Sequence, residues 1–344
     1  NSRVTSLFED PSGNLWIGTE DNGLNKFDLK ENVFTNFHPS PNSGSIAFSN
    51  IHGLLVTGDT LWIGTFEHGL DMMNVNTGKV FRHFYADGKT GSLANNFIFN
   101  ILKTRKGEIL LATGRGIYKY LSSSSTFENY SGFPGYIFYT NLFEDNRGTI
   151  WAGTWRDGLL FYNPGTKKSG RLIHVANDTN SLLSNRINRV FQDRSDNIWV
   201  ATEGGLSQLK KGQYKFRHFT MQNGLPSNLI LAMLEDNNGV LWITTTRGLV
   251  RYNQTTGSMK TFTRVNGLLS DQFNYNSAYK DKNGRMYFGS VRGMIRFNPD
   301  RYSDPNYNST VYITGLQIQN NEVKSGEKDS PLKNSVIFTK DIKL

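Results

Sequence analysis

The sequence contains no cysteine among its 344 residues, so disulfide bridges, zinc–thiolate sites and a thiol nucleophile are excluded. Proline is scarce, with 9 residues, and charged residues make up only 19% of the chain. No apolar run approaches the roughly 18 residues that a membrane-spanning helix requires. The lack of cysteine fits a reducing or an oxidising compartment equally well, so it does not indicate a location.

Glycine and aromatic residues are abundant instead. The 34 glycines indicate many tight turns, and the 13% aromatic content is typical of a β-rich chain whose strands pack on both faces. The formal net charge of +9 favours anionic partners. Because the sequence shows neither a run of basic residues nor a known nucleic-acid-binding module, we predict no nucleic-acid partner.

A five-residue segment with an aromatic residue at its second position recurs along the chain. Its first copy is Leu15-Trp16-Ile17-Gly18-Thr19, and its second position falls seven times, at intervals of 41 to 48 residues: Trp16, Trp62, Leu110, Trp151, Trp199, Trp242 and Tyr287. A period of about 40–50 residues in a strand-rich chain is typical of β-propellers, in which each repeat forms one blade.

Each repeat divides into four short predicted strands. An apolar run that ends in an acidic residue precedes an Asp-x-x-Gly turn, such as Asp145 to Gly148, and the tryptophan segment follows. A Gly-apolar pair then opens the third strand, and paired aromatic residues such as Phe34 and Phe37 mark the fourth. The sequence therefore predicts an all-β, seven-bladed propeller of four-stranded antiparallel blades, with first strands lining the axis and no helix longer than a turn or two.

The seventh repeat looks incomplete. No clear aromatic strand follows its third strand at Gly293–Phe297. Because propellers usually close by pairing a strand from one terminus into the last blade, we expect imperfect closure. Either residues upstream of Asn1 supply the missing strand in the native protein, or Tyr302–Tyr307 does so poorly.

The repeat resembles the two-component-regulator propeller repeat, whose pattern is an apolar strand, Asp-x-x-Gly, an apolar-Trp-Ile-Gly-Thr segment and Gly-Leu. The resemblance covers residues 4–299 and occurs seven times. Residues 311–318 and 337–342 resemble the first strands of the tyrosine-patterned β-sandwich domain that follows such propellers. It implies a propeller at residues 1–300 and, at 301–344, a linker with the opening strands of a truncated C-terminal sandwich.

The resemblance also implies a function. Proteins of this family are typically periplasmic sensor regions of membrane-bound hybrid histidine kinases in bacteria that degrade polysaccharides. It implies an oligosaccharide ligand, anionic in view of the net charge, homodimerisation through the sandwich, and an inner-membrane anchor outside these residues. The chain begins inside a repeat at Asn1, so we expect it to be a segment of a longer protein, and this segment is predicted not to be an enzyme.

The chemistry-bearing residues fit repeat architecture better than catalysis. His83 and His218 occupy the same position of different repeats, and the turn aspartates belong to separate blades, too far apart for the paired carboxylates of glycoside hydrolysis. No metal-ligand spacing appears, so no cofactor, metal or catalytic residue is predicted. The alternative is a propeller enzyme that resembles streptogramin lyase or another glycan-acting propeller enzyme, with a His and acidic pair and a metal at one mouth.

A ligand site is predicted on the face that carries the loops between second and third strands, because rigid scaffolds present variable loops for binding. An exposed Trp stacks on the apolar face of a sugar, and Arg pairs with carboxylate or sulfate. The alternative is that Arg is merely a tolerated turn residue in this repeat. The candidate ligand-binding residues are Phe66, His68, Arg115, Trp155, Arg156, Arg247 and Arg292.

Overall fold

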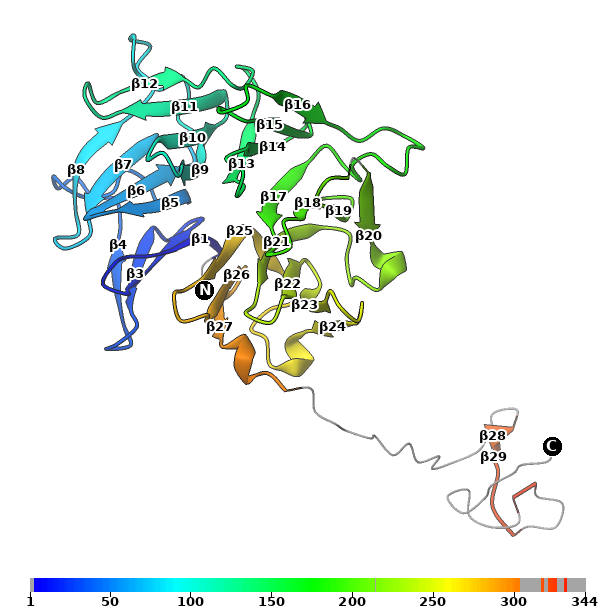
Figure 1. Ribbon diagram of the computed structural model, residues 1–344. Helices are drawn as coiled ribbons and strands as arrows, with labels where there is room; N and C mark the ends of the chain where they lie inside the picture. The colour runs from blue at the N-terminus through cyan, green and yellow to red at the C-terminus, as the bar shows by residue number, and fades with distance from the viewer. Residues whose placement is uncertain (1–2, 214, 304–316, 319–320, 327–330, 333–344) are drawn as a thin grey trace. The chain divides into compact units, whose positions relative to one another are not determined.

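A computed structural model describes residues 3–213, 215–303, 317–318, 321–326 and 331–332 of the chain. The chain divides into two units, Asn1–Arg301 and Tyr302–Leu344. The first unit is a ring of seven antiparallel sheets around a central axis (Figure 1), which confirms the predicted all-β propeller. In every sheet the strands follow one another in sequence order.

Six blades have four strands, and the strands described in the seventh number three. Blades one and two contain β1 (Val4–Glu9), β2 (Leu15–Thr19), β3 (Leu24–Asp28), β4 (Val33–Phe37), β5 (Ile51–Thr57), β6 (Thr60–Thr65), β7 (Leu70–Asn74) and β8 (Lys79–Phe84). Blades three and four contain β9 (Ile98–Lys103), β10 (Ile109–Thr113), β11 (Gly116–Leu121), β12 (Thr126–Asn129), β13 (Tyr139–Glu144), β14 (Ile150–Thr154), β15 (Leu159–Tyr162) and β16 (Ser169–Leu172).

The remaining blades have the same plan. Blades five to seven contain β17 (Ile187–Gln192), β18 (Ile198–Thr202), β19 (Leu206–Leu209), β20 (Phe216–Phe219), β21 (Ile230–Glu235), β22 (Val240–Thr245), β23 (Gly248–Asn253), β24 (Met259–Phe262), β25 (Phe273–Lys280), β26 (Met286–Ser290) and β27 (Gly293–Phe297). The helices of the described residues are three single 3₁₀ turns: η1 (Met221–Asn223), η2 (Arg264–Asn266) and η3 (Pro299–Arg301). No helix in the described part of the chain has the length and apolar character needed to cross a membrane.

The first strand of each blade lies nearest the axis (Figure 1). These inner strands contact one another in cyclic order, from β1 through β5, β9, β13, β17 and β21 to β25, which contacts β1. The ring is therefore closed at its inner edge. The second strands pack between neighbouring blades, and Trp16 and Trp199 are fully buried there.

The fourth strands differ from the expectation that strands are buried on both faces. Phe34 in β4 and Phe81 in β8 have exposed fractions of 53% and 57%. The blades radiate from the axis, so the gap between neighbouring sheets widens towards the rim. Aromatic residues on the outer strands therefore cover the blade edge instead of entering an inter-blade core.

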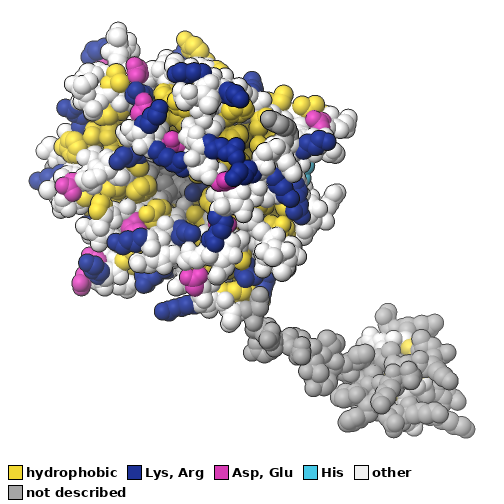
Figure 2. Space-filling view, in the orientation of Figure 1, with side chains coloured by type: hydrophobic (Ala, Val, Ile, Leu, Met, Phe, Trp, Pro, Cys, Tyr) yellow, Lys and Arg dark blue, Asp and Glu magenta, His cyan; other side chains and the backbone are white. Residues whose placement is uncertain are grey.

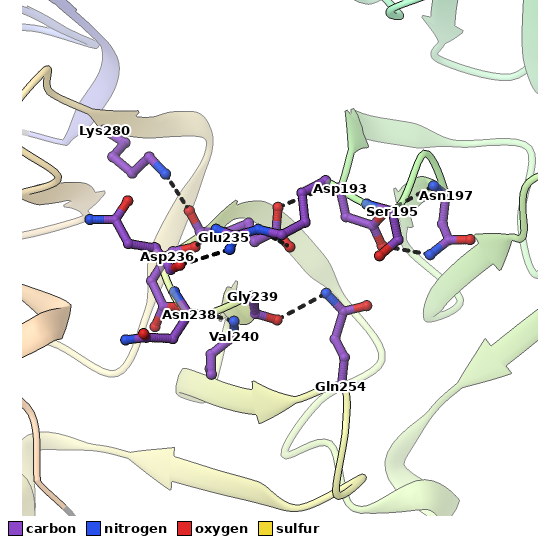
Figure 3. Close-up of polar contacts among 12 residues, drawn as sticks. Asp193, Ser195, Asn197, Glu235, Asp236, Asn238, Gly239, Val240, Gln254 and Lys280 are labelled. Carbon is purple, nitrogen blue, oxygen red and sulfur yellow. Dashed lines mark hydrogen bonds and ion pairs between the residues drawn. The ribbon is translucent and has the colours of Figure 1, made fainter.

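Each turn aspartate links the turn to the second strand of its own blade. In blade five, one Asp193 carboxylate oxygen accepts the backbone N–H groups of Ser195 and Asn197, each at 2.9 Å (Figure 3). The other oxygen accepts the Trp199 indole N–H at 2.7 Å. The aspartate-to-indole bond recurs in blades one, four and six, and in blade seven a Tyr287 hydroxyl replaces the indole. The turn and the buried tryptophan thus share one carboxylate.

The residue before the turn aspartate links neighbouring blades. Its side chain accepts a backbone N–H from the preceding blade, where the donor is the residue directly after the first residue of the turn. The acceptor and donor pairs are Glu144 with Arg105, Gln192 with Asn146 and Glu235 with Arg194. Glu9 accepts the backbone N–H of Lys282 in the same way, which links blade seven to blade one. The acidic residue at the end of the predicted first strand is therefore an inter-blade bridge.

Blade seven ends, in the described residues, with β27, followed by η3. The candidate closing segment Tyr302–Tyr307 lies mostly outside the described residues, so both explanations for closure remain predictions. In the second unit, β28 (Gln317–Ile318) pairs with β29 (Asn321–Glu322) in antiparallel fashion. The proposed sandwich strands at 311–318 and 337–342 fall almost entirely outside the described residues, so the sandwich also remains a prediction.

The shared carboxylate gives a first prediction. Replacing Asp193 by Ala leaves the N–H of the fully buried Trp199 and the turn amides without an acceptor. We expect the free energy of unfolding to fall by about 3 kcal/mol, because buried donors are costly to leave unpaired. Urea denaturation followed by tryptophan fluorescence measures this change. Asp21→Ala is the control, because Asp21 is exposed and forms no side-chain hydrogen bond with a described residue; equal stability of the two variants would contradict the prediction.

Candidate functional site

The loops between second and third strands are held by a hydroxyl group in every blade. In blade four, Thr154 Oγ1 donates to the Gly158 carbonyl at 2.8 Å and accepts the Asp157 backbone N–H at 2.7 Å. The residues that donate to the equivalent glycine carbonyl are Thr19, Thr65, Thr113, Thr154, Thr202, Thr245 and Ser290. The Thr of the repeated segment therefore fixes the start and end of each loop, and the loop side chains project from a rigid base.

An aromatic pocket of about 490 Å³ opens on this face, where the inner strands begin. Six of its ten lining residues are aromatic, and the ten together come from blades two, three, four, five and seven. The lining residues are Phe66, Phe97, Phe99, Phe138, Thr140, Trp155, Arg156, Asn188, Tyr275 and Asn276. A largely apolar pocket of 300–1,000 Å³ with a few polar groups is typical of small-ligand sites.

The aromatic rings support one another across blade boundaries. The Phe66 and Phe97 rings meet edge to face with centroids 4.6 Å apart, and the Phe99 and Phe138 centroids are 4.7 Å apart. Trp155 packs against Phe138 at 6.1 Å while keeping an exposed fraction of 44%. Ring contacts of this kind fix ring orientation, so Trp155 is a pre-oriented platform at the rim.

The Trp155 ring also contacts a cation. The Arg186 guanidinium lies 5.1 Å from the Trp155 ring centroid. Arg186 is fixed in turn by Glu203, whose carboxylate lies 3.0 Å from its Nη1. A cation over an aromatic face is attracted by the ring quadrupole. Trp155 is therefore in contact with both Phe138 and Arg186 while keeping part of its surface exposed.

Blade seven contributes an insertion to this site. In β13, Tyr139 pairs with Thr154 and Asn141 with Gly153, which is a bulge of one residue. In β25, Phe273 pairs with Ser290, but the next paired residue is Ala278, opposite Phe288. Between equivalent paired positions, the inner strand of blade seven (Phe273 to Ala278) is therefore two residues longer than that of blade four (Tyr139 to Leu142), and Tyr275 and Asn276 lie in this segment.

The inserted segment crosses to the opposite side of the ring. The Asn276 side chain donates to the Thr140 carbonyl at 3.0 Å and accepts from the Asn141 side-chain amide at 3.1 Å, both in blade four. Its backbone carbonyl accepts from the Arg189 guanidinium of blade five at 3.1 Å. Asn276 has a φ of 55°, a left-handed conformation that Asn tolerates better than most residues. These bonds hold the insertion across the channel below the aromatic rings.

His52 lies behind the aromatic wall with an exposed fraction of 5%. Its ring contacts Phe66, Phe99 and Tyr275, with centroids 4.9 to 5.9 Å away. No described residue forms a hydrogen bond with the His52 side chain, and burial lowers its pKa to about 4. His52 is therefore neutral at pH 7 and helps position three pocket residues.

The structure brings together three of the seven predicted ligand-binding residues. Phe66, Trp155 and Arg156 line the aromatic pocket. The other four residues do not line it. His68 stacks on Phe48 with centroids 4.0 Å apart, and Arg115 lies 4.7 Å from the Tyr136 ring.

Arg247 and Arg292 are exposed, and their backbone N–H groups donate to the loop-fixing hydroxyls of Thr245 and Ser290. Arg115 has the same backbone bond to Thr113. The three arginines therefore share a turn position, and the structure does not gather their side chains at one site. This placement agrees with the alternative reading of Arg as a turn residue.

Sequence reasoning missed most of the pocket. The missed lining residues are Phe97, Phe99, Phe138, Thr140, Asn188, Tyr275 and Asn276. One pattern in the sequence does indicate the insertion, namely the spacing between the first residue of the inner strand and the turn aspartate. This spacing is six residues in blade four (Tyr139 to Asp145) and eight in blade seven (Phe273 to Asp281). Comparing this spacing between repeats would have identified blade seven as different.

The histidines of the outer strands have structural contacts, as predicted. His83 of β8 lies 2.6 Å from Asp71 of β7, and His218 of β20 lies 3.1 Å from Ser207 of β19. Both pairs are directly opposite across adjacent strands. Among the described residues no group of three His, Asp or Glu side chains is arranged to hold a metal ion.

Comparison with known proteins agrees with this architecture. Residues 1–21, 132–156, 181–204 and 224–247 match the family described as "Two component regulator propeller". The chain carries two-component-regulator propeller repeats. This chain is also 28% identical over 208 residues to Histidine kinase P4 of Formosa agariphila, a match that covers 60% of this chain and 12% of that protein.

Two solved structures resemble this chain in fold. PorZ of Porphyromonas gingivalis, described as a surface component of the type-IX secretion system, has a TM-score of 0.65 and 18% identity, over 87% of this chain and 46% of PorZ. A catalytically inactive virginiamycin B lyase of Staphylococcus aureus with quinupristin has a TM-score of 0.65 and 11% identity, over 86% of this chain and 94% of the lyase. At these identities the likeness shows the fold alone.

The buried His52 gives a second prediction. Because its pKa in the folded protein lies below the unfolded value of 6.5, its neutral form stabilises the fold fully above pH 6.5, and this stability is lost as pH falls towards 4. We expect a loss of about 3 kcal/mol from this group across that window. The measurement is urea denaturation of the wild type and His52→Phe between pH 7 and 4, in which the variant should lose less stability. Identical pH dependence in the two proteins would refute this role.

Proposed function

We propose that this propeller is the ligand-sensing part of an extracytoplasmic two-component sensor and that it binds an oligosaccharide in the aromatic pocket. The repeats and the similarity to a histidine kinase support a sensor. The pre-oriented ring of Trp155 beside Phe138 is the observation that carries the ligand proposal. In the whole protein we place the propeller in the periplasm, with an inner-membrane anchor and a dimerising sandwich outside the described residues.

The pocket offers both kinds of contact that a sugar uses. Aromatic side chains stack on the apolar C–H faces of pyranose rings, and polar groups bond to the hydroxyls. Thr140, Asn188 and Asn276 lie beside the six aromatic residues of the lining and supply polar atoms. Because Trp155 and Tyr275 both line the pocket of about 490 Å³ and come from different blades, a sugar in the pocket meets aromatic side chains from more than one blade.

The charges favour an anionic sugar. Arg156 is the charged residue of the lining, and none of the ten lining residues is acidic. Basic side chains outnumber acidic ones on the face drawn in Figure 2, in line with the net charge of +9. An arginine at the rim forms paired hydrogen bonds with a carboxylate or a sulfate group.

The alternative function is enzymatic, like that of a streptogramin lyase or another glycan-acting propeller enzyme. Such an enzyme needs an acid–base pair at the mouth. The pocket lining contains no Asp, Glu or His, and the nearby His52 is enclosed by aromatic rings. The closest His–Asp pair, His83 with Asp71, joins the two outer strands of blade two. The geometry therefore supports binding without turnover.

A third prediction tests the pocket. Trp155→Ala and Arg156→Ala should each lower the affinity for a bound oligosaccharide by at least about tenfold, or 1.4 kcal/mol, because each removes a direct contact. The melting temperature should not change, since both side chains are exposed. A glycan array identifies the ligand, and calorimetry on the intact sensor region measures the affinity.

Arg292→Ala is the matched control, because Arg292 is an exposed loop residue of the same face that does not line the pocket. Its affinity should equal that of the wild type. Wild-type affinity in both pocket variants would place the ligand elsewhere. Cleavage of the bound oligosaccharide, detected by mass spectrometry, would favour the enzymatic alternative instead.

A further inference from the structure

Arg189 is a cation without an acidic partner inside the ring. It lies on the inner strand β17, and its guanidinium donates to the Asn276 carbonyl of the inserted segment of β25 at 3.1 Å. Arg189 forms no ion pair with any described residue. The side chain is half-buried, because channel solvent reaches it while the blades enclose it, and burial alone lowers its pKa to about 10.

The described residues accept a hydrogen bond from only part of the Arg189 guanidinium. An arginine side chain carries five N–H donors, and the bond to Asn276 is the one that the described residues provide. A charge enclosed in protein without a counter-charge costs stability, and a neutral side chain would make the same single bond. A bridge to Asn276 therefore does not explain why the position carries a cation.

Arg189 also lies directly beside the aromatic pocket. Its chain neighbour Asn188 and its hydrogen-bond partner Asn276 both line the pocket. Asn188 is held by its own bond to the Ile230 carbonyl at 2.7 Å, so it does not compete for the guanidinium. The positive charge therefore lies next to the floor of the pocket, while Arg156 lies in its lining.

We propose that Arg189 forms an anion subsite in the channel, next to the pocket floor, that takes the carboxylate or sulfate group of an acidic sugar. The guanidinium fork matches the two oxygens that either group presents. The bound anion supplies the counter-charge that the enclosed Arg189 lacks. This inference rests on the proposed function, and it adds that an acidic sugar ring enters the pocket with its charged group towards the channel.

The experiment compares Arg189→Gln with the wild type. Gln keeps a donor for the Asn276 carbonyl and removes the charge. Melting temperatures are measured with sodium glucuronate, glucose 6-sulfate, glucose and sodium sulfate at matched ionic strength. In the wild type, glucuronate or glucose 6-sulfate at ten times its Kd should raise the melting temperature by about 2 °C more than glucose does. In Arg189→Gln that difference should disappear, and the unliganded melting temperature should stay level or rise.

Arg247→Gln is the matched control, because Arg247 is exposed on the same face and does not line the pocket. It should keep the wild-type difference between acidic and neutral sugars. Arg189→Met serves as a second variant and should behave as Arg189→Gln does. A wild-type difference that survives in Arg189→Gln would overturn the proposal, as would a response to inorganic sulfate without any response to the sugar acids.

The outcomes also separate this inference from the proposed function. One outcome is that Trp155→Ala loses oligosaccharide binding, while the wild type and Arg189→Gln bind acidic and neutral sugars equally well. This outcome would support the pocket as the ligand site and refute the anion subsite. A glucuronate response that depends on Arg189, together with wild-type affinity in Trp155→Ala and Arg156→Ala, would keep the subsite and overturn oligosaccharide binding at the aromatic rim.

Discussion

The structure depends on one carboxylate in each of blades one, four, five and six, which caps a turn and holds a buried indole at the same time. The Asp193 carboxylate accepts hydrogen bonds both from the turn amides and from the indole N–H of the fully buried Trp199. An indole could not be buried so completely without an acceptor. Because turn and indole share the acceptor, the first two strands of a blade are fixed in register. Blade three has Thr104 and Leu110 instead, so there the donor and the acceptor are both absent.

This arrangement assigns different tasks to the two faces of the ring. On the turn face, side chains such as Glu235 bridge neighbouring blades through the Arg194 backbone, and Lys280 donates to the Glu235 carbonyl (Figure 3). On the opposite face, the Thr or Ser hydroxyls fix each loop from within its own blade. Backbone bonds also link neighbouring blades on the loop face, as when the Gly158 N–H donates to the Asn185 carbonyl at 3.0 Å. The loop face is left free to vary its side chains, and the aromatic pocket lies there.

Structural features that recur in every repeat could be predicted from the sequence, whereas features found in a single blade could not. Trp, Asp and Gly recur at fixed positions, so blade number, strand order and the loop face follow from the periodicity. Phe66, Trp155 and Arg156 could be named because they stand in those loops. Phe97 and Phe138 precede inner strands, where apolar residues are expected for packing alone. Arg189 lies within an inner strand, and only the crossing from blade seven shows that its side chain enters the channel.

The departure from symmetry in blade seven is what turns a channel into a pocket. Seven identical inner strands would leave an open passage along the axis with equivalent walls. Two added residues in β25 bring Asn276 across to Thr140, Asn141 and Arg189, and place Tyr275 among rings from blades two and three. A ligand that contacts Tyr275 therefore contacts a segment that is hydrogen-bonded to blades four and five. The same insertion that closes the channel therefore also joins the last blade to the opposite side of the ring.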